Sequence, residues 1–158
     1  MYIFTDGSCL GNGASSSANG GIGIIIKQGS KELVRISKGY TNTTNNRMEM
    51  LAFIEALKYL KEHSKAHLKI NMCLDSQYVL KGTTEWLQGW KKKNWKNSAK
   101  KDVLNKDLWM QIDTLVYQED IGKNIHWDWV KGHNGHIENE ICDELAKAGA
   151  HNPTQKDQ

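Results

Sequence analysis

The chain lacks the features that would place it in several specialised classes of protein. Its three cysteines (Cys9, Cys73 and Cys142) are odd in number and have no CxxC spacing, which argues against a disulfide framework or a zinc site. No apolar run approaches the roughly 20 residues that a membrane helix needs, and the opening residues MYIFTDGS contain no basic and apolar leader. We therefore expect a protein of the reducing cytoplasm that has no membrane partner.

Length and composition indicate one ordinary globular domain. The chain has 158 residues, of which 39% are hydrophobic and 25% are charged, and a domain of this size buries about 70% of its unfolded surface. There is no internal repeat and no linker, so we predict a single domain over residues 1–152 and a polar, disordered tail over residues 153–158. The net charge of +3 is weak evidence for a polyanionic partner. Nothing in the sequence requires an oligomer, and a monomer is the expected state.

Hydrophobic periodicity predicts an α/β domain. Residues 1–6 and 22–27 are short apolar runs, and residues 31–40 alternate, so three tightly connected strands should form an antiparallel meander. Residues 46–63 then follow a 3.6-residue rhythm, which predicts a helix. A meander of strands followed by alternating helices and strands predicts a mixed sheet with helices on its faces. Further strands are predicted over residues 68–74 and 125–131, and further helices over residues 76–81 (ended by Gly82), 84–92, 104–117 and 137–150.

Four acidic side chains stand where predicted elements begin or end. Each of them alone could be a turn former, a helix cap or a partner of a helix dipole. If the four converge, their mutual repulsion requires cations, and Mg²⁺ suits a cluster of carboxylate oxygens. They are Asp6 at the end of the first strand, Glu49 near the start of the first long helix, Asp75 at the end of the fourth strand and Asp143 on the last helix.

The acids lie in four longer blocks: TDGSCLGN (5–12), TTNNRMEM (43–50), DSQYV (75–79) and WVKGHNGHIENEICDELA (129–146). In composition, order and spacing these blocks resemble cellular ribonuclease H of type 1. The resemblance extends from Tyr2 to about Pro153. It implies the ribonuclease H-like fold, an α/β domain whose five-stranded mixed sheet (three antiparallel strands, then parallel ones) is flanked by helices, with a basic helical protrusion.

The resemblance implies an endonuclease that hydrolyses the RNA strand of an RNA–DNA hybrid with two metal ions. One ion lowers the pKa of the attacking water and the other stabilises the leaving 3′ oxygen, which leaves 5′-phosphate and 3′-hydroxyl ends. Mg²⁺ is the expected cofactor, with Mn²⁺ as an alternative. The metal-binding carboxylates of the family match Asp6, Glu49, Asp75 and Asp143, its catalytic histidine matches His133, and Glu140 is a candidate for outer-sphere support.

The resemblance also assigns contacts to the two strands of the hybrid. Telling RNA from DNA requires groups that sense the 2′-hydroxyl, which both donates and accepts hydrogen bonds. In loops, however, Asn and Gly commonly do no more than make turns. The implied strand contacts are Cys9, Gly11, Asn12, Asn45, Asn46 and Gln77, and the implied holders of a DNA phosphate are Thr44 and Asn105.

A one-sided basic segment over residues 81–106 also points to a nucleic-acid substrate. It carries eight lysines against two acids, Glu85 and Asp102, and matches the basic protrusion of the family. The lysines suit phosphate contacts, whose affinity falls steeply with salt. Tryptophans lie between the lysines, and packing beneath them explains these rings as well as substrate contact does. The candidate substrate-binding residues here are Trp86, Trp90, Lys91, Lys92, Lys93 and Lys96.

One loop departs from the family, and three other interpretations remain open. The loop over residues 11–21 is longer than usual and has no proline, which could weaken substrate binding without altering the metal site. Transposases, integrases and resolvases share the fold, but they carry added domains for which this chain has no room. A hybrid-binding module without catalysis would lack one or more of the four acids. The start at Met1 favours a free-standing protein over a domain excised from a reverse transcriptase.

Overall fold

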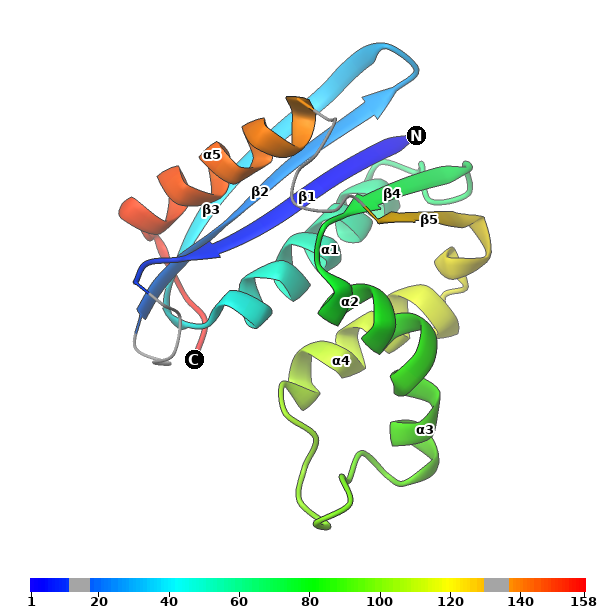
Figure 1. Ribbon diagram of the computed structural model, residues 1–158. Helices are drawn as coiled ribbons and strands as arrows, with labels where there is room; N and C mark the ends of the chain where they lie inside the picture. The colour runs from blue at the N-terminus through cyan, green and yellow to red at the C-terminus, as the bar shows by residue number, and fades with distance from the viewer. Residues whose placement is uncertain (12–17, 130–136) are drawn as a thin grey trace.

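Six strands form one mixed sheet in the computed structural model (Figure 1), which describes residues 1–11, 18–129 and 137–158. The predicted α/β class is confirmed, with six strands in place of five. The first three strands form the predicted antiparallel meander, and the others pair in parallel. In the order β5-β4-β1-β2-β3-β6 across the sheet, the strands are β5 (Ile125–Trp129), β4 (Ile70–Leu74), β1 (Tyr2–Cys9), β2 (Ala18–Gln28), β3 (Lys31–Thr43) and β6 (Gln155–Lys156).

Two long helices cover the two faces of the sheet (Figure 1). α1 (Asn45–Glu62) lies on one face, and α5 (Ile137–His151) lies on the other along β2 and β3. Side chains alternate along β2, so Ile24 and Ile26 pack into the main core with α1, whereas Ile25 lies in a smaller cluster under α5. Among the described residues, no helix combines the length and the apolar character needed to cross a membrane.

Close contact between α5 and the sheet depends on glycine. A Cβ atom on Gly23 would lie 2.1 Å from the carbonyl oxygen of Cys142, and one on Gly39 would lie 1.8 Å from that of Gly149. Both distances are far shorter than van der Waals contact, so a side chain at either position would push the helix away. Because Asp143 directly follows Cys142, this packing also determines how near Asp143 lies to the sheet.

Of the elements between β4 and β5, α3 (Leu87–Lys92) and the loop after it extend farthest from the sheet and form a protrusion, whereas buried residues of α4 (Lys106–Asp113) and of the turns after it belong to the main core (Figure 1). The α-helix predicted over residues 76–81 does end at Lys81, with Gly82 as its C-cap, but the backbone of Gly82 stays helical (φ −58°, ψ −45°) and the chain continues as a π-helical turn. A Cβ atom on Gly82 would lie 1.9 Å from the Trp109 ring, so glycine here allows two helices to pack closely. The elements between β4 and β5 are α2 (Gln77–Lys81), the π-helical turn η1 (Gly82–Trp86), α3 (Leu87–Lys92), α4 (Lys106–Asp113), the π-helical turn η2 (Thr114–Gln118) and the 3-10 turn η3 (Ile121–Asn124).

The polar tail over residues 153–158 is ordered along the outer edge of β3, so the prediction of a disordered tail is wrong. The amide of Thr154 donates to the carbonyl oxygen of Gly39 (3.2 Å), and that of Asp157 donates to the carbonyl oxygen of Thr41 (3.1 Å). The carboxylate of Asp157 also accepts hydrogen bonds of 2.7 and 3.0 Å from the guanidinium of Arg47. Composition alone suggested disorder, whereas an open sheet edge and a buried arginine hold the tail in place.

Candidate active site

Three of the four predicted acids meet beside β1 and the end of β4. Asp6 lies within β1, Asp75 follows the last residue of β4, and Glu49 lies near the start of α1. One carboxylate oxygen from each residue can be chosen so that all three lie within 4.8 Å of one another. A set of oxygens of this kind matches the preference of Mg²⁺ and other hard divalent cations.

Strand register and one glycine bring these acids together. Phe4 pairs with Cys73 across the parallel β1–β4 ladder, so Asp6 and Asp75, each two residues further on, come side by side. Residue 7 is glycine, and a Cβ atom there would lie 2.4 Å from the backbone nitrogen of Glu49. The third acid can therefore approach only because position 7 has no side chain. Sequence reasoning passed over Gly7, although its place directly after Asp6 in the TDGS block was an available signal.

If all three carboxylates were ionised, they would repel one another strongly. Burial, followed by the charges of Asp6 and Asp75, raises the pKa of Glu49 well above its ordinary value. Asp6 is itself 3% exposed, and its Oδ1 accepts a hydrogen bond of 2.9 Å from the amide of Gly7. Carboxylates that share one site do not all stay ionised at neutral pH without a counter-charge. The arrangement therefore favours either proton uptake or a bound cation.

Asp143 stands apart from this cluster. Its carboxylate lies 2.9 Å from the ammonium of Lys147, one turn further along α5, and among the described residues the group of clustered acids does not include it. Its assignment as a metal ligand stays a prediction. The same holds for Glu140, an exposed residue in the first turn of α5. His133 and Asn12 lie outside the described residues.

Thr44 and Asn105, which were predicted to hold a DNA phosphate, are linked through Arg47. Thr44 caps α1, and its Oγ1 accepts a hydrogen bond from the amide of Arg47 (3.3 Å). Asn105 has a left-handed backbone (φ 60°), and its Oδ1 accepts a hydrogen bond from the Arg47 guanidinium (3.4 Å). Arg47 itself forms ion pairs with Asp107 and Asp157, which neutralise its charge. Thr44 and Asn105 therefore both hydrogen-bond to one buried, neutralised arginine. Sequence reasoning did not single out Arg47, although it stands in the TTNNRMEM block.

The described residues predicted to contact the two strands lie in or next to β1, α1 and α2. Cys9 is buried, with its thiol 3.8 Å from the carbonyl oxygen of Thr43, and burial raises the pKa of this thiol. Gly11 is exposed and has a φ of +73°, a conformation that favours glycine. Their contacts with a hybrid stay predictions. The remaining strand-contact candidates are Asn45 and Asn46, exposed in the first turn of α1, and Gln77, exposed at the start of α2.

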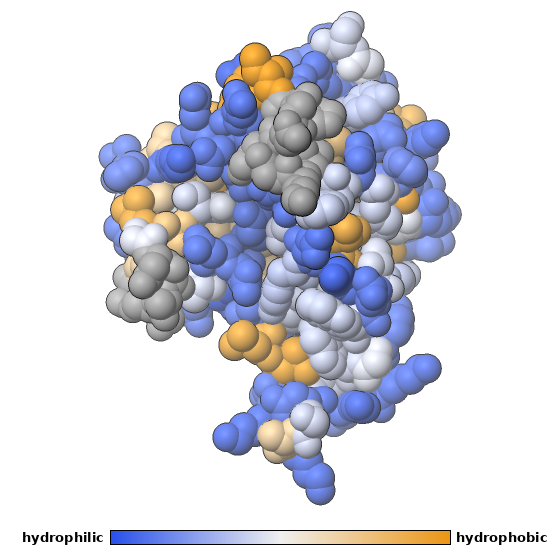
Figure 2. Space-filling view, viewed as in Figure 1, coloured by the Kyte–Doolittle hydropathy of each residue, from blue (hydrophilic) through white to orange (hydrophobic). Residues whose placement is uncertain are grey.

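In the basic segment, tryptophans pack together and lysines surround them. The rings of Trp86 and Trp90 have centroids 6.0 Å apart, and Trp90 also packs on the buried ring of Trp109 at 5.3 Å. Trp86 is still 41% exposed, so packing and substrate contact both remain open for this ring. Figure 2 shows mostly hydrophilic residues over the outer end of the protrusion. The lysines Lys91, Lys92, Lys93 and Lys96 belong to this segment.

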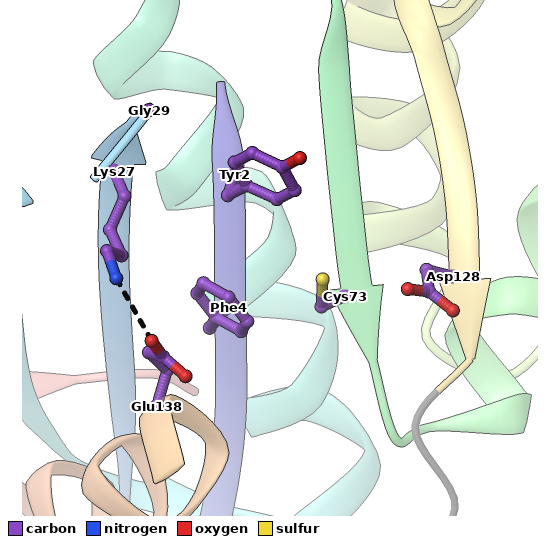
Figure 3. A pocket seen from close by; sticks show the side chains of 7 residues that line it. All are labelled: Tyr2, Phe4, Lys27, Gly29, Cys73, Asp128 and Glu138. Atoms are coloured by element: carbon purple, nitrogen blue, oxygen red, sulfur yellow. Dashed lines mark hydrogen bonds and ion pairs between the residues drawn. The ribbon is translucent and has the colours of Figure 1, made fainter. Parts of the chain in front are cut away.

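A separate hollow of about 270 Å³ lies towards the start of β1 (Figure 3). Tyr2 and Phe4 line it, and Lys27 pairs with Glu138 across 3.0 Å at its side. It contains none of the three clustered acids, and two of its charged groups neutralise each other. The chemistry suggested by the acids therefore lies elsewhere on the sheet.

Comparison with known proteins agrees with this geometry. The family model for RNase H matches residues 1–151. The chain belongs to the ribonuclease H family. It is 54% identical to Ribonuclease H of Actinobacillus pleuropneumoniae serotype 5b and 53% identical to Ribonuclease HI of Pasteurella multocida, in each case over 157 residues that cover 99% of this chain and 94% of the relative.

A solved structure supports the same assignment. LC9-RNase H1, described as a type 1 RNase H with the type 2 active-site motif, has a TM-score of 0.78 and 31% identity, over 97% of this chain and 72% of that one. The predicted resemblance to bacterial type 1 ribonuclease H, the fold and the assignment as a ribonuclease H enzyme are thereby confirmed.

Proposed function

We propose that this ribonuclease H cleaves the RNA strand of RNA–DNA hybrids as an endonuclease, using divalent ions held at the acidic cluster. The observation that carries the proposal is the approach of Asp6, Glu49 and Asp75 within 4.8 Å in a chain of this family. LC11-RNase H1, which shares the fold with a TM-score of 0.67 at 21% identity, is described in complex with an RNA/DNA hybrid. A hybrid is therefore the first substrate to test.

The donor set fits a hard divalent ion. All three ligand groups are carboxylates. The raised pKa of Glu49 indicates that a nearby positive charge would stabilise the ionised cluster. Bound ions supply charge neutralisation for the scissile phosphate and lower the pKa of a water molecule, as a two-ion mechanism of hydrolysis requires. We propose Mg²⁺ as the natural ion and Mn²⁺ as a substitute. Asp143 is the fourth proposed ligand, and in binding metal it would give up its ion pair with Lys147.

The protein's own groups have separate roles in this proposal. Asp6, Glu49 and Asp75 would hold the ions, which would neutralise charge at the scissile phosphate, and His133 would relay a proton or help the product to leave. The expected products carry 5′-phosphate and 3′-hydroxyl ends. Glu140 gives outer-sphere support from the first turn of α5.

We assign the recognition of an RNA–DNA hybrid, as opposed to other duplexes, to small polar groups close in sequence to the acids. Asn45 and Asn46 are exposed at the start of α1, four and three residues before Glu49, and Gln77 is exposed two residues after Asp75. Side-chain amides both donate and accept hydrogen bonds, which suits a 2′-hydroxyl. Cys9, Gly11 and Asn12 are also proposed to contact the two strands of the hybrid. A monomeric state and a cytoplasmic location stay predictions.

Cleavage of defined duplexes tests this function. The protein is incubated with Mg²⁺ and a labelled RNA–DNA hybrid, with duplex RNA and duplex DNA in parallel reactions. The expected result is cleavage of the RNA strand of the hybrid alone, which EDTA abolishes. Asp6→Asn should remove the activity, whereas Asp120→Asn should not, because Asp120 is an exposed turn residue with a φ of 61° that asparagine also adopts.

Other outcomes would point to the alternatives. Cleavage of duplex DNA would instead favour the resolvase-like class of the same fold. Binding of the hybrid by folded protein without any cleavage would favour a binding module.

A further inference from the structure

The C-terminal tail contacts the segment that leads into α1. The amide of Asp157 donates to the carbonyl oxygen of Thr41 (3.1 Å), and its carboxylate accepts a hydrogen bond of 2.8 Å from the hydroxyl of Thr43. Gln158 and Asn42 hydrogen-bond to each other twice, at 2.9 and 3.3 Å. Asn42 has a left-handed backbone (φ 60°), which departs from regular strand geometry. The tail therefore fixes an irregular stretch of chain directly before α1.

The tail also holds the side chain of Arg47. The Asp157 carboxylate accepts hydrogen bonds from Nε (2.7 Å) and Nη2 (3.0 Å) of this guanidinium. Asp107 accepts from Nη1 (2.9 Å) and Nη2 (2.8 Å), and Asn105 accepts from Nη1 (3.4 Å). A guanidinium has five N–H donors, so these contacts engage all of them. Arg47 is therefore a fixed support and has no donor left for a ligand.

The two residues that Arg47 supports still have donors to offer. Thr44 Oγ1 accepts from the amide of Arg47, and in the described parts of the chain its hydroxyl hydrogen has no acceptor. Asn105 uses its oxygen on Arg47 and donates one amide hydrogen to the hydroxyl of Tyr78 (3.1 Å), which leaves a second amide hydrogen. Both residues are partly exposed. A pair of this kind suits a phosphate, whose oxygens accept hydrogen bonds.

We propose that Asp157 is a positioning residue for substrate binding. Through Arg47 it holds Thr44 and Asn105 in the arrangement that donates hydrogen bonds to one phosphate of the DNA strand. The tail then contributes to affinity without touching the substrate. A change in the tail should weaken binding and leave the chemical step at the acidic cluster nearly unaffected. The proposal rests on the proposed function, because it takes the hybrid as the ligand.

Steady-state cleavage of a hybrid separates positioning from simple charge. If charge alone mattered, removing a carboxylate would strengthen the binding of a polyanion. Asp157→Ala should instead raise KM about tenfold, the effect of one weakened charged hydrogen bond, and change kcat less than about twofold. Arg47→Lys should act similarly, because lysine keeps the charge but loses the planar fork of donors. Glu32→Ala removes the same charge from an exposed site on β3, and this matched control should not raise KM.

Hybrids that lack single phosphate charges locate the effect. Each phosphate of the DNA strand is replaced in turn by an uncharged methylphosphonate, and KM is measured for every hybrid. The parent protein should show a raised KM at the position that Thr44 and Asn105 hold, and Thr44→Ala should remove this sensitivity. Asp157→Ala should remove it as well, because the contact is already weakened, whereas a general loss of stability would not cancel the effect of one phosphate. All measurements are made well below the melting temperature of each variant.

Three results would overturn the proposal. The first is a folded Asp157→Ala protein that keeps the parent's full sensitivity at that position, which would leave the tail with a role in stability alone. The second is an unchanged or lowered KM for Asp157→Ala on the unmodified hybrid. The third is a parent protein that is insensitive at every position of the DNA strand. Failure of the parent to cleave any hybrid would overturn the proposed function itself, and this result is distinct because it precedes every comparison of variants.

Discussion

Replacement of Asp157 by alanine should destabilise the fold, although the residue lies in a polar tail. Its side chain is 5% exposed, and it accepts hydrogen bonds of 2.7 and 3.0 Å from Arg47, whose side chain is also 5% exposed. A third hydrogen bond, of 2.8 Å, comes from the hydroxyl of Thr43. Removing one partner of a buried ion pair typically costs about 3–5 kcal/mol, because the remaining charge is left uncompensated.

Here the loss should be somewhat smaller, because a second acid remains. Asp107 still accepts hydrogen bonds of 2.9 and 2.8 Å from the same guanidinium. We therefore expect the free energy of unfolding to fall by about 2–4 kcal/mol. For a chain of this size, that corresponds to a decrease in Tm of roughly 4–16 °C. Urea denaturation followed by circular dichroism measures the first quantity and calorimetry the second.

An exposed ion pair provides the matched control. Glu32 and Arg35 lie 2.8 Å apart, but their side chains are 37% and 49% exposed, so Glu32→Ala should change the free energy of unfolding by less than about 1 kcal/mol. The loss in free energy of unfolding for Asp107→Ala should lie between those for Asp157→Ala and Glu32→Ala, because the Asp107 side chain is 62% exposed. Equal losses for Asp157→Ala and Glu32→Ala would refute the reasoning that burial makes the Arg47 pair strong.

Three further predictions concern charge and packing at the same end of the sheet. Asp6→Asn should raise the Tm of metal-free protein, because it removes one of the charges that raise the pKa of Glu49, and it should abolish any Mg²⁺-dependent rise in Tm. Gly7→Ala should reduce cleavage strongly and lower the free energy of unfolding by about 1–3 kcal/mol, since its methyl group would lie 2.4 Å from the Glu49 nitrogen; normal activity would contradict this. The hydrogen bonds from Arg47 hold the pKa of Asp107 below its usual range. As pH decreases, the Asp107 carboxylate is therefore protonated more readily in the unfolded chain than in the folded one, and the free energy of unfolding falls. In urea titrations at about pH 5 and about pH 3, Asp107→Asn should lose less stability than the parent protein.

Local patterns in the sequence predicted most of the elements. The 3.6-residue rhythm placed the first helix at residues 46–63, and the structure has α1 at Asn45–Glu62. Prediction from periodicity succeeds for this helix because one of its sides packs against the sheet, so that buried residues recur with the helical period. Asp6 and Asp75 were also accessible to sequence reasoning, because each stands at a predicted strand end.

Contacts between distant residues were not predictable in the same way. Arg47 and Asp157 are 110 residues apart, and no local pattern connects them. Gly82 caps the predicted helix, but its close approach to the Trp109 ring could not be predicted from the local sequence. The ion pair of Lys91 with Asp113 was equally hidden, because a run of lysines does not reveal which of them meets a buried acid.

The short pairing of β6 with β3 also has a consequence for solubility. β6 pairs with Tyr40 and Thr41 of β3, and other residues of the tail hydrogen-bond to Gly39, Asn42 and Thr43. Within the described residues, positions 31–38 of this thirteen-residue strand have no strand paired along the outer edge. An open strand edge is a template for pairing with another chain, and charged side chains along it discourage such pairing. The uncovered part of β3 carries Lys31, Glu32, Arg35 and Lys38, whereas the part that the tail covers, residues 39–43, carries no charged side chain. Loss of the tail would therefore expose the least protected stretch of the edge, and a shortened chain should aggregate more readily at high concentration.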